Sequence, residues 1–117
     1  MESGISMLEF EEYKSKLNAL KPTLDDLGKA LKLDDARSEI SELEAEALKD
    51  DFWSDIQHSQ KVLQRTKQLK NKCAAYDKLS STWDDLYTMC EMALDENDDS
   101  MRDELKAEFA TFEQKLE

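Results

Sequence analysis

The sequence predicts an all-α protein, an elongated antiparallel helical bundle of three to four helices with one long central helix. The 117 residues include only two Gly and one Pro, and 38% are charged, which leaves little material for the turns of a sheet protein. The stretch from Ser54 to Leu94 contains neither Gly nor Pro, and its apolar and small residues recur at alternating steps of three and four. We therefore expect a single helix of roughly 60 Å there, along which the other segments pack.

The first predicted helix covers about residues 5–33. Its apolar residues alternate three and four apart over three heptads, a spacing that keeps one seam facing a partner helix. They are Phe10, Tyr13, Leu17, Leu20, Leu24, Leu27 and Leu31. Pro22 falls inside this seam and removes one backbone donor. Because the apolar phase continues across Pro22, we favour a kink there, with two separate helices as the alternative.

A second helix of four turns is predicted to follow residues 34 and 35. Asp34 and Asp35 are candidate N-caps. The apolar positions after them recur at steps of four, three and four, and the Glu residues between them form a solvated acidic face. These apolar positions are Ala36, Ile40, Leu43 and Ala47.

Two adjacent aromatic residues, Phe52 and Trp53, interrupt the pattern between acidic residues. We expect a connection whose two rings fill the end of the bundle, while Ser54 caps the long helix and Gln57 completes a capping box. Phe52, Trp53 and, on the long helix, Trp83 are therefore predicted to be structural. The alternative is that the aromatic pair binds a partner.

The long helix is predicted to end in the acidic run at residues 95–99, and Ser100 with Asp103 is expected to open a last helix. A short link usually makes two helices antiparallel neighbours. We therefore expect the last helix to fold back along the C-terminal half of the long one, and the first two helices to cover its N-terminal half.

The residues indicate no reaction, and we expect neither an enzyme nor a cofactor. Cys73 and Cys90 lie on one helix about 25 Å apart, so they are expected to be unpaired, buried residues in a reducing compartment. His58 and Asp55 form half of a carboxylate-histidine metal motif, but the sequence holds no second such pair, so no metal is expected.

The net charge and the hydropathy of the chain limit the classes of partner that we expect and indicate its location in the cell. The net charge of -12 opposes binding to phosphate backbones over most of the surface, so we expect no DNA partner. No segment approaches the ~20 apolar residues that span a bilayer, and we expect a cytoplasmic protein with no membrane partner. Residues 1–6 are expected to be a flexible extension, with Met7 as a candidate natural start, ahead of one helical domain over residues 7–117.

Several segments resemble one family. The segment Asp51-Phe52-Trp53, followed by Asp55 and then by Ser59-Gln60 and Val62-Leu63, resembles the Asp-Phe-Trp stretch and Ala-Gln pair of the bacterial peptide chain release factor 2 family. Residues 8–14, 33–35, 40–48, 95–99 and the last helix resemble the N-terminal domain of that family. The resemblance covers essentially all of residues 7–117. It departs where the Ala of the Ala-Gln pair is Ser59, and where Asp50 or Asp51 replaces a frequent Pro.

The resemblance implies a role in translation termination at the stop codons UGA and UAA. In that family the N-terminal domain contributes binding rather than chemistry. It lies toward the base of the large-subunit stalk of the ribosome, where the GTPase release factor 3 acts, and is joined to the remaining domains of its own factor. The family's Ser-Pro-Phe and Gly-Gly-Gln motifs do not occur here, so we expect an isolated first domain that neither decodes nor hydrolyses.

Two alternatives to this interpretation remain. One is the N-terminal domain of a type 1 release factor. The other is an acidic cytosolic coiled-coil adaptor unrelated to the ribosome, because such a protein would share the composition and the heptads.

Lys61, Arg65 and Lys72 are the candidate ribosome contacts. They fall along one flank of the apolar stripe on the long helix, in the main basic concentration of an acidic chain. Lys67, Lys70 and Lys78 lie on its other side. The flank either binds ribosomal RNA or an acidic ribosomal protein, or balances the charge of the Glu-rich second helix.

Overall fold

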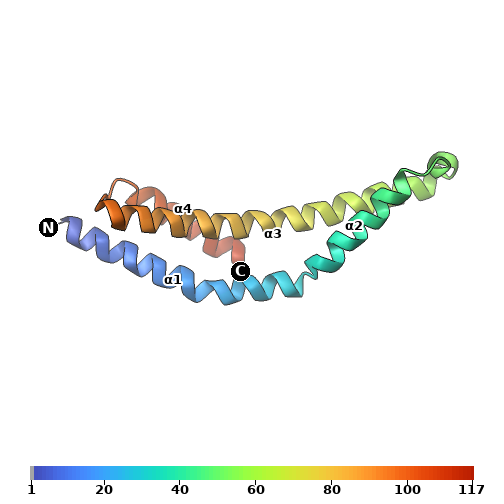
Figure 1. The fold of residues 1–117 in the computed structure, drawn as a ribbon. Helices are drawn as coiled ribbons and strands as arrows, with labels where there is room; N and C mark the ends of the chain where they lie inside the picture. Colours follow the sequence, from blue (N-terminus) through green and yellow to red (C-terminus); the bar gives the residue numbers. More distant parts are fainter. Residues whose placement is uncertain (1) are drawn as a thin grey trace. The chain divides into compact units, whose positions relative to one another are not determined.

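The computed structural model describes the backbone of residues 2–117 and the side chains of residues 7–117. Within this part of the chain there is no strand (Figure 1). The elements in order are α1 (Glu2–Ala30), α2 (Leu33–Ala47), the short 3-10 helix η1 (Phe52–Ser54), α3 (Ile56–Glu96) and α4 (Arg102–Leu116). The predicted all-α class and the long central helix, which has 41 residues, are confirmed.

The first helix begins at Glu2, ahead of the predicted start near Ile5. Met1 and the side chains of residues 2–6 lie outside the described residues, so the flexible extension over residues 1–6 stays a prediction. Helix α1 runs through Pro22, and the alternative of two separate helices is therefore wrong.

The chain divides into two compact units. Unit 1 contains Met1–Asp26 and Lys78–Glu117, which are most of α1, the C-terminal part of α3 and all of α4. Unit 2 contains Leu27–Asp77, which are the end of α1, α2, η1 and the first part of α3.

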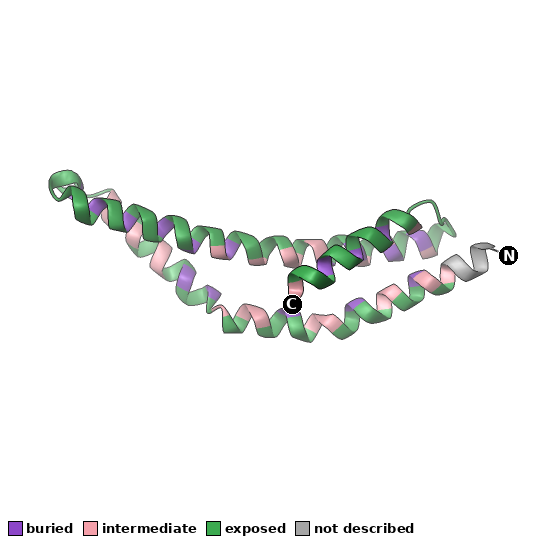
Figure 2. Ribbon diagram, turned by 180° about the vertical axis from the view of Figure 1, so that it is seen from behind, coloured by how far each residue is buried: buried purple, intermediate pink, exposed green. Residues whose placement is uncertain are grey.

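Unit 1 has a core built from all three of its helices, visible as the buried stripes in Figure 2. Lys14 lies over the ring of Tyr87 and Lys21 over the ring of Trp83, so α1 and α3 are antiparallel here. The expectation that the first two helices cover the N-terminal half of α3 is thus wrong for α1, which packs on the C-terminal part. The buried apolar residues are Phe10, Leu17, Leu24, Trp83, Leu86, Cys90, Ala93, Leu105, Phe109 and Phe112.

Unit 2 has a smaller core between α2 and α3. Its buried members are Leu33, Ala36, Leu69 and Cys73, and partly buried side chains including Tyr76 pack against them. Ala36, Leu69, Cys73 and Tyr76 follow the apolar stripes predicted on the two helices, whereas Leu33 was expected at the end of the first helix. The stripe on α3 continues into Ser59, Val62 and Thr66, all of which are buried.

The junction between α1 and α2 differs from the sequence expectation. Lys32 precedes α2 with φ 53 and ψ 52, and no side chain caps this helix. Asp34 and Asp35 are not N-caps but lie in the first turn of α2, where their negative charges interact favourably with the helix dipole and stabilise the helix. The helix starts two to three residues earlier than expected, at Leu33, whose side chain lies in the core of unit 2 and is only 7% exposed.

The predicted end of α3 within residues 95–99 is confirmed. Asn97 adopts φ 51, and the N–H of Asp98 donates to the carbonyl of Ala93 at 2.9 Å, which closes the last turn of the helix. Ser100 does not cap α4, because the helix begins at Arg102 and the residue in the N-cap position is Met101.

Candidate functional site

The connection between α2 and α3 exposes three large apolar side chains. Leu48 is 85%, Trp53 59% and Ile56 62% exposed. We call these three residues the turn patch. All three fall within nine consecutive residues of unit 2. Exposed apolar side chains that gather in one place are typical of interaction sites.

A buried aromatic residue fixes the position of Trp53. Phe52 is 6% exposed, and its carbonyl accepts a hydrogen bond from the hydroxyl of Ser59, which is fully buried. The ring of Trp53 meets the ring of Phe52 edge to face, with centroids 5.1 Å apart and an interplanar angle of 80°. Trp53 is thus held against an anchored neighbour while most of its indole faces solvent.

The prediction that both rings fill the end of the bundle holds for Phe52 and is wrong for Trp53. Both residues belong to η1, and a 3-10 helix has about three residues per turn. Successive side chains then point about a third of a turn apart, so only one of the two rings can face the core.

The cap of α3 also differs from the expectation. Asp55, rather than Ser54, occupies the N-cap position, and its Oδ1 accepts a 3.1 Å hydrogen bond from the N–H of His58. The hydroxyl of Ser54 donates instead to the carbonyl of Asp51 at 2.6 Å. The predicted capping box of Ser54 and Gln57 is therefore wrong, and the turn is held by Asp55 and Ser59.

A cavity of about 310 Å³ lies beside the turn between α2 and α3. His58, Glu46, Lys49 and Asp51 are among its lining residues. The Nε2 of His58 contacts the Oε1 of Glu46, so this histidine is engaged within the unit. Among the described residues no three His, Cys, Asp or Glu side chains gather as a metal site.

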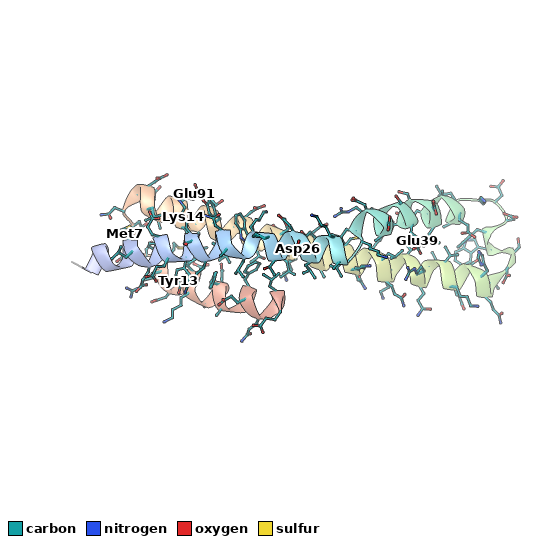
Figure 3. The ribbon with its side chains drawn as sticks, turned by 90° about the horizontal axis from the view of Figure 1, so that it is seen from below. Met7, Tyr13, Lys14, Asp26, Glu39 and Glu91 are labelled. Carbon is teal, nitrogen blue, oxygen red and sulfur yellow. The ribbon has the colours of Figure 1, made fainter. Side chains whose placement is uncertain are left out.

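The three predicted cations differ in their environments. The guanidinium of Arg65 donates two hydrogen bonds to the carboxylate of Glu39 on α2, at 2.7 and 3.1 Å. These hydrogen bonds hold the pKa of Glu39, labelled on α2 in Figure 3, below its usual range. Lys61 is exposed, whereas Lys72 is partly buried. The charge-balance interpretation is thus correct for Arg65, and within the described residues Lys61 makes no ion pair.

Two further ion pairs join α2 to α3. Lys70 contacts Glu44 at 3.3 Å, and Arg37 contacts Asp77 at 3.1 Å. Residues later in α2 therefore face residues earlier in α3, as in an antiparallel helix pair. The connection that joins these two antiparallel helices contains the turn patch.

Both cysteine thiols are free and buried. Burial raises the pKa of Cys90 to about 11, so this thiol is protonated at neutral pH and unsuited to nucleophilic chemistry. None of the described helices is both long and apolar enough to cross a membrane.

The sequence did not single out Leu48 or Ile56 as surface residues. Leu48 directly follows Ala47, so it lies one residue out of phase with the apolar stripe of α2. The sequence alone could therefore have marked Leu48 as a surface residue. Ile56 keeps the phase of the stripe on α3, three residues before the buried Ser59. Its exposure follows from its place as the first residue of α3.

Comparison with known proteins gives consistent matches. The family model described as PCRF domain matches residues 36–117. Peptide chain release factor 2 of Clostridium perfringens (strain SM101 / Type A) is 30% identical over 111 residues, which are 95% of this chain and 30% of that protein. The protein of the same name from Saccharopolyspora erythraea is 32% identical over 106 residues, 91% of this chain and 29% of the relative.

The Borreliella burgdorferi protein, also named Peptide chain release factor 2, is 32% identical over 100 residues, 86% of this chain and 27% of its own length. The chain thus spans less than a third of the length of these relatives. No solved structure matches it. The resemblance found on the sequence motifs is confirmed by these matches.

Proposed function

This chain belongs to the PCRF domain family, and we propose that it is the non-catalytic N-terminal domain of a peptide chain release factor that acts in translation termination in the cytoplasm. In this proposal the parent factor acts at the stop codons UGA and UAA. The domain helps dock that factor on the ribosome near the base of the large-subunit stalk, where the GTPase release factor 3 acts. The remaining domains of the factor supply decoding and hydrolysis.

One observation carries this proposal. The relatives named Peptide chain release factor 2 match 86–95% of the chain, so the similarity includes α1 and α2 as well as the long helix. A general acidic coiled coil would share heptads but not the order of segments around Phe52 and Trp53. The shared name of these relatives favours a type 2 factor over a type 1 factor.

The turn patch is the surface that we assign to docking. Trp is enriched among the residues that dominate binding energy at interfaces, and Trp53 is held outward by Phe52. Lys61 lies five residues beyond Ile56 and offers a cation for a phosphate or a carboxylate of the ribosome. Of the three predicted contact cations, we expect Lys61 to contribute most, because Arg65 is already bound to Glu39.

Charge reversal on the two sides of α3 tests the docking surface. Lys61, Arg65 and Lys72 are changed together to Glu, and a matched control changes Lys67, Lys70 and Lys78 to Glu. The net charge changes equally in both variants, and each variant loses one ion pair to α2, Arg65 with Glu39 or Lys70 with Glu44. The affinity of the fluorescently labelled chain for purified ribosomes is then measured alongside its melting temperature.

We expect the first triple variant to lose about tenfold or more in ribosome affinity. The control triple should lose clearly less, at a similar melting temperature. Equal losses in both variants would show only a general charge effect, and unchanged affinity in both would remove the basic flank from the docking surface.

The parent factor is tested by the reading frame that encodes the chain. Sequencing it beyond codon 117 should reveal a Ser-Pro-Phe motif followed by a Gly-Gly-Gln motif. A continuation that lacks both motifs would leave the acidic adaptor as the better interpretation.

A further inference from the structure

A groove in unit 1 is lined by methionine side chains and carboxylates. Met89 and Met92 come from the C-terminal part of α3, and Met101 from the residue before α4. We call these three residues and the space between them the methionine groove. Its volume is about 380 Å³, and Met92 is 55% and Met101 37% exposed.

The end of α3 shapes this groove. The left-handed conformation of Asn97 reverses the chain, and the 2.9 Å hydrogen bond from the N–H of Asp98 to the carbonyl of Ala93 holds the reversal close to the helix. The N–H of Ser100 donates to the Oδ1 of Asp98 at 2.9 Å. These contacts hold the turn in which Met101 lies, so the groove is preformed rather than made by a loose loop.

The chemistry of the groove selects its ligand. Methionine is flexible and polarizable, and it adapts to apolar side chains of different shapes. Asp85, Glu96 and Asp98 also line the groove. Residues 84–104 hold nine acidic residues and a single basic one, Arg102. Anionic lipids and phosphate backbones are repelled by such a surface, whereas a cationic segment with apolar side chains is attracted.

We propose that the methionine groove binds a basic amphipathic helix of a partner protein. Apolar side chains spaced three and four apart on that helix enter between Met89, Met92 and Met101, and its Lys and Arg residues face the carboxylates of α3. This site is separate from the turn patch and does not depend on the proposed function.

A synthetic peptide tests the site directly. The probe is a fluorescein-labelled helix of about 18 residues made of leucine and lysine, with the leucines on one face. It is titrated with the 117-residue chain, and fluorescence anisotropy reports the Kd. Two control peptides are used, one with the same composition in scrambled order and one with Glu in place of Lys.

We expect saturable binding of one peptide per chain, with a Kd that rises about tenfold between about 50 and 300 mM NaCl. The double variant Met92→Ala with Met101→Ala should raise the Kd about fivefold or more. The matched control is Leu8→Ala with Leu63→Ala, which removes two apolar side chains exposed by 64% and 43% outside the groove. This control should bind the peptide as the parent does.

Three results would overturn the proposal. One is equal binding of either control peptide, and another is an equal loss of affinity in both double variants. The third comes from sedimentation equilibrium without peptide: a dimer that is lost only in the methionine variant would show that a second copy of this chain occupies the groove.

Discussion

The indole Nε1–H of Trp83 on α3 donates a 2.7 Å hydrogen bond to the backbone carbonyl of Leu17 on α1. Pro22 lies five residues after Leu17, has no N–H and crowds the carbonyl of the residue four positions before it. The bond from Trp83 therefore ties α1 to α3 next to the place where the helix lacks one of its own hydrogen bonds. The Nζ of Lys21 lies 4.5 Å from the centroid of the same indole ring.

Removing the donor should destabilise unit 1. We expect Trp83→Phe to lower the free energy of unfolding by about 1–3 kcal/mol, because a buried hydrogen bond between α1 and α3 is lost and the cation–π contact weakens. Urea unfolding followed by circular dichroism measures the change. Trp53→Phe serves as the matched control and should stay within about 0.5 kcal/mol of the parent. Similar values for the two variants would mean that the Trp83 bond contributes nothing.

The two neighbouring aromatic residues of η1 should behave differently. Phe52 is buried and Trp53 is 59% exposed. We expect Phe52→Ala to cost about 3–5 kcal/mol, as aromatic truncations in cores do, and Trp53→Ala to cost less than about 1 kcal/mol. Thermal unfolding of the two variants compares them. A large loss for Trp53→Ala would return Trp53 to the structural role that the sequence predicted.

Gly28 is needed where α1 meets α3 in unit 2. A Cβ atom at this position would lie 2.8 Å from the hydroxyl oxygen of Tyr76 and 2.9 Å from its Cζ. Gly→Ala in a helix usually stabilises by about 0.5–1 kcal/mol, and we expect Gly28→Ala to show no such gain.

The gain should return when Tyr76→Ala is already present. A double-mutant cycle with urea unfolding should then give a coupling energy of about 1 kcal/mol between the two positions. Additive effects would mean that the Tyr76 ring moves aside without cost.

Stability should decrease at alkaline pH through Cys90. Burial raises the pKa of this thiol from 9.0 to about 11, so the folded state holds the proton more tightly than the unfolded state. The stability that this group contributes is complete below a pH of about 9 and is lost as the pH rises through about 11. The melting temperature of Cys90→Ala should fall less over this range than that of the parent. Parallel falls would assign the pH effect to other groups.

The helical fold was predictable because its information is local. The spacing of Val62, Leu69 and Cys73 marked the buried face of α3, and the acidic run at residues 95–99 marked its end. The continuous apolar phase also favoured a helix that continues across Pro22, as α1 does. Each of these features depends on residues within a few turns of one another.

The candidate sites were less predictable because they depend on backbone conformation and helix register. The 3-10 geometry of η1 turns Trp53 outward, and periodicity contains no sign of it. The pairing of Arg65 with Glu39 joins residues 26 positions apart, so it requires the register of α2 on α3. The methionine groove requires the chain reversal at Asn97. The polar residues at 95–99 predict that a turn lies there, but they do not predict the left-handed conformation that Asn97 adopts.

Site-specific cross-linking tests the central claim, that the turn patch docks on the ribosome, most directly. A photoreactive phenylalanine analogue is placed at position 53 in one sample and, as a control, at the exposed position 111 on α4 in another. Both samples are irradiated with purified ribosomes, and the cross-linked components are identified by mass spectrometry and primer extension. We expect position 53 to cross-link to components at the base of the large-subunit stalk, and position 111 to give no such products. The absence of ribosomal products from position 53, or the same products from both positions, would contradict the claim.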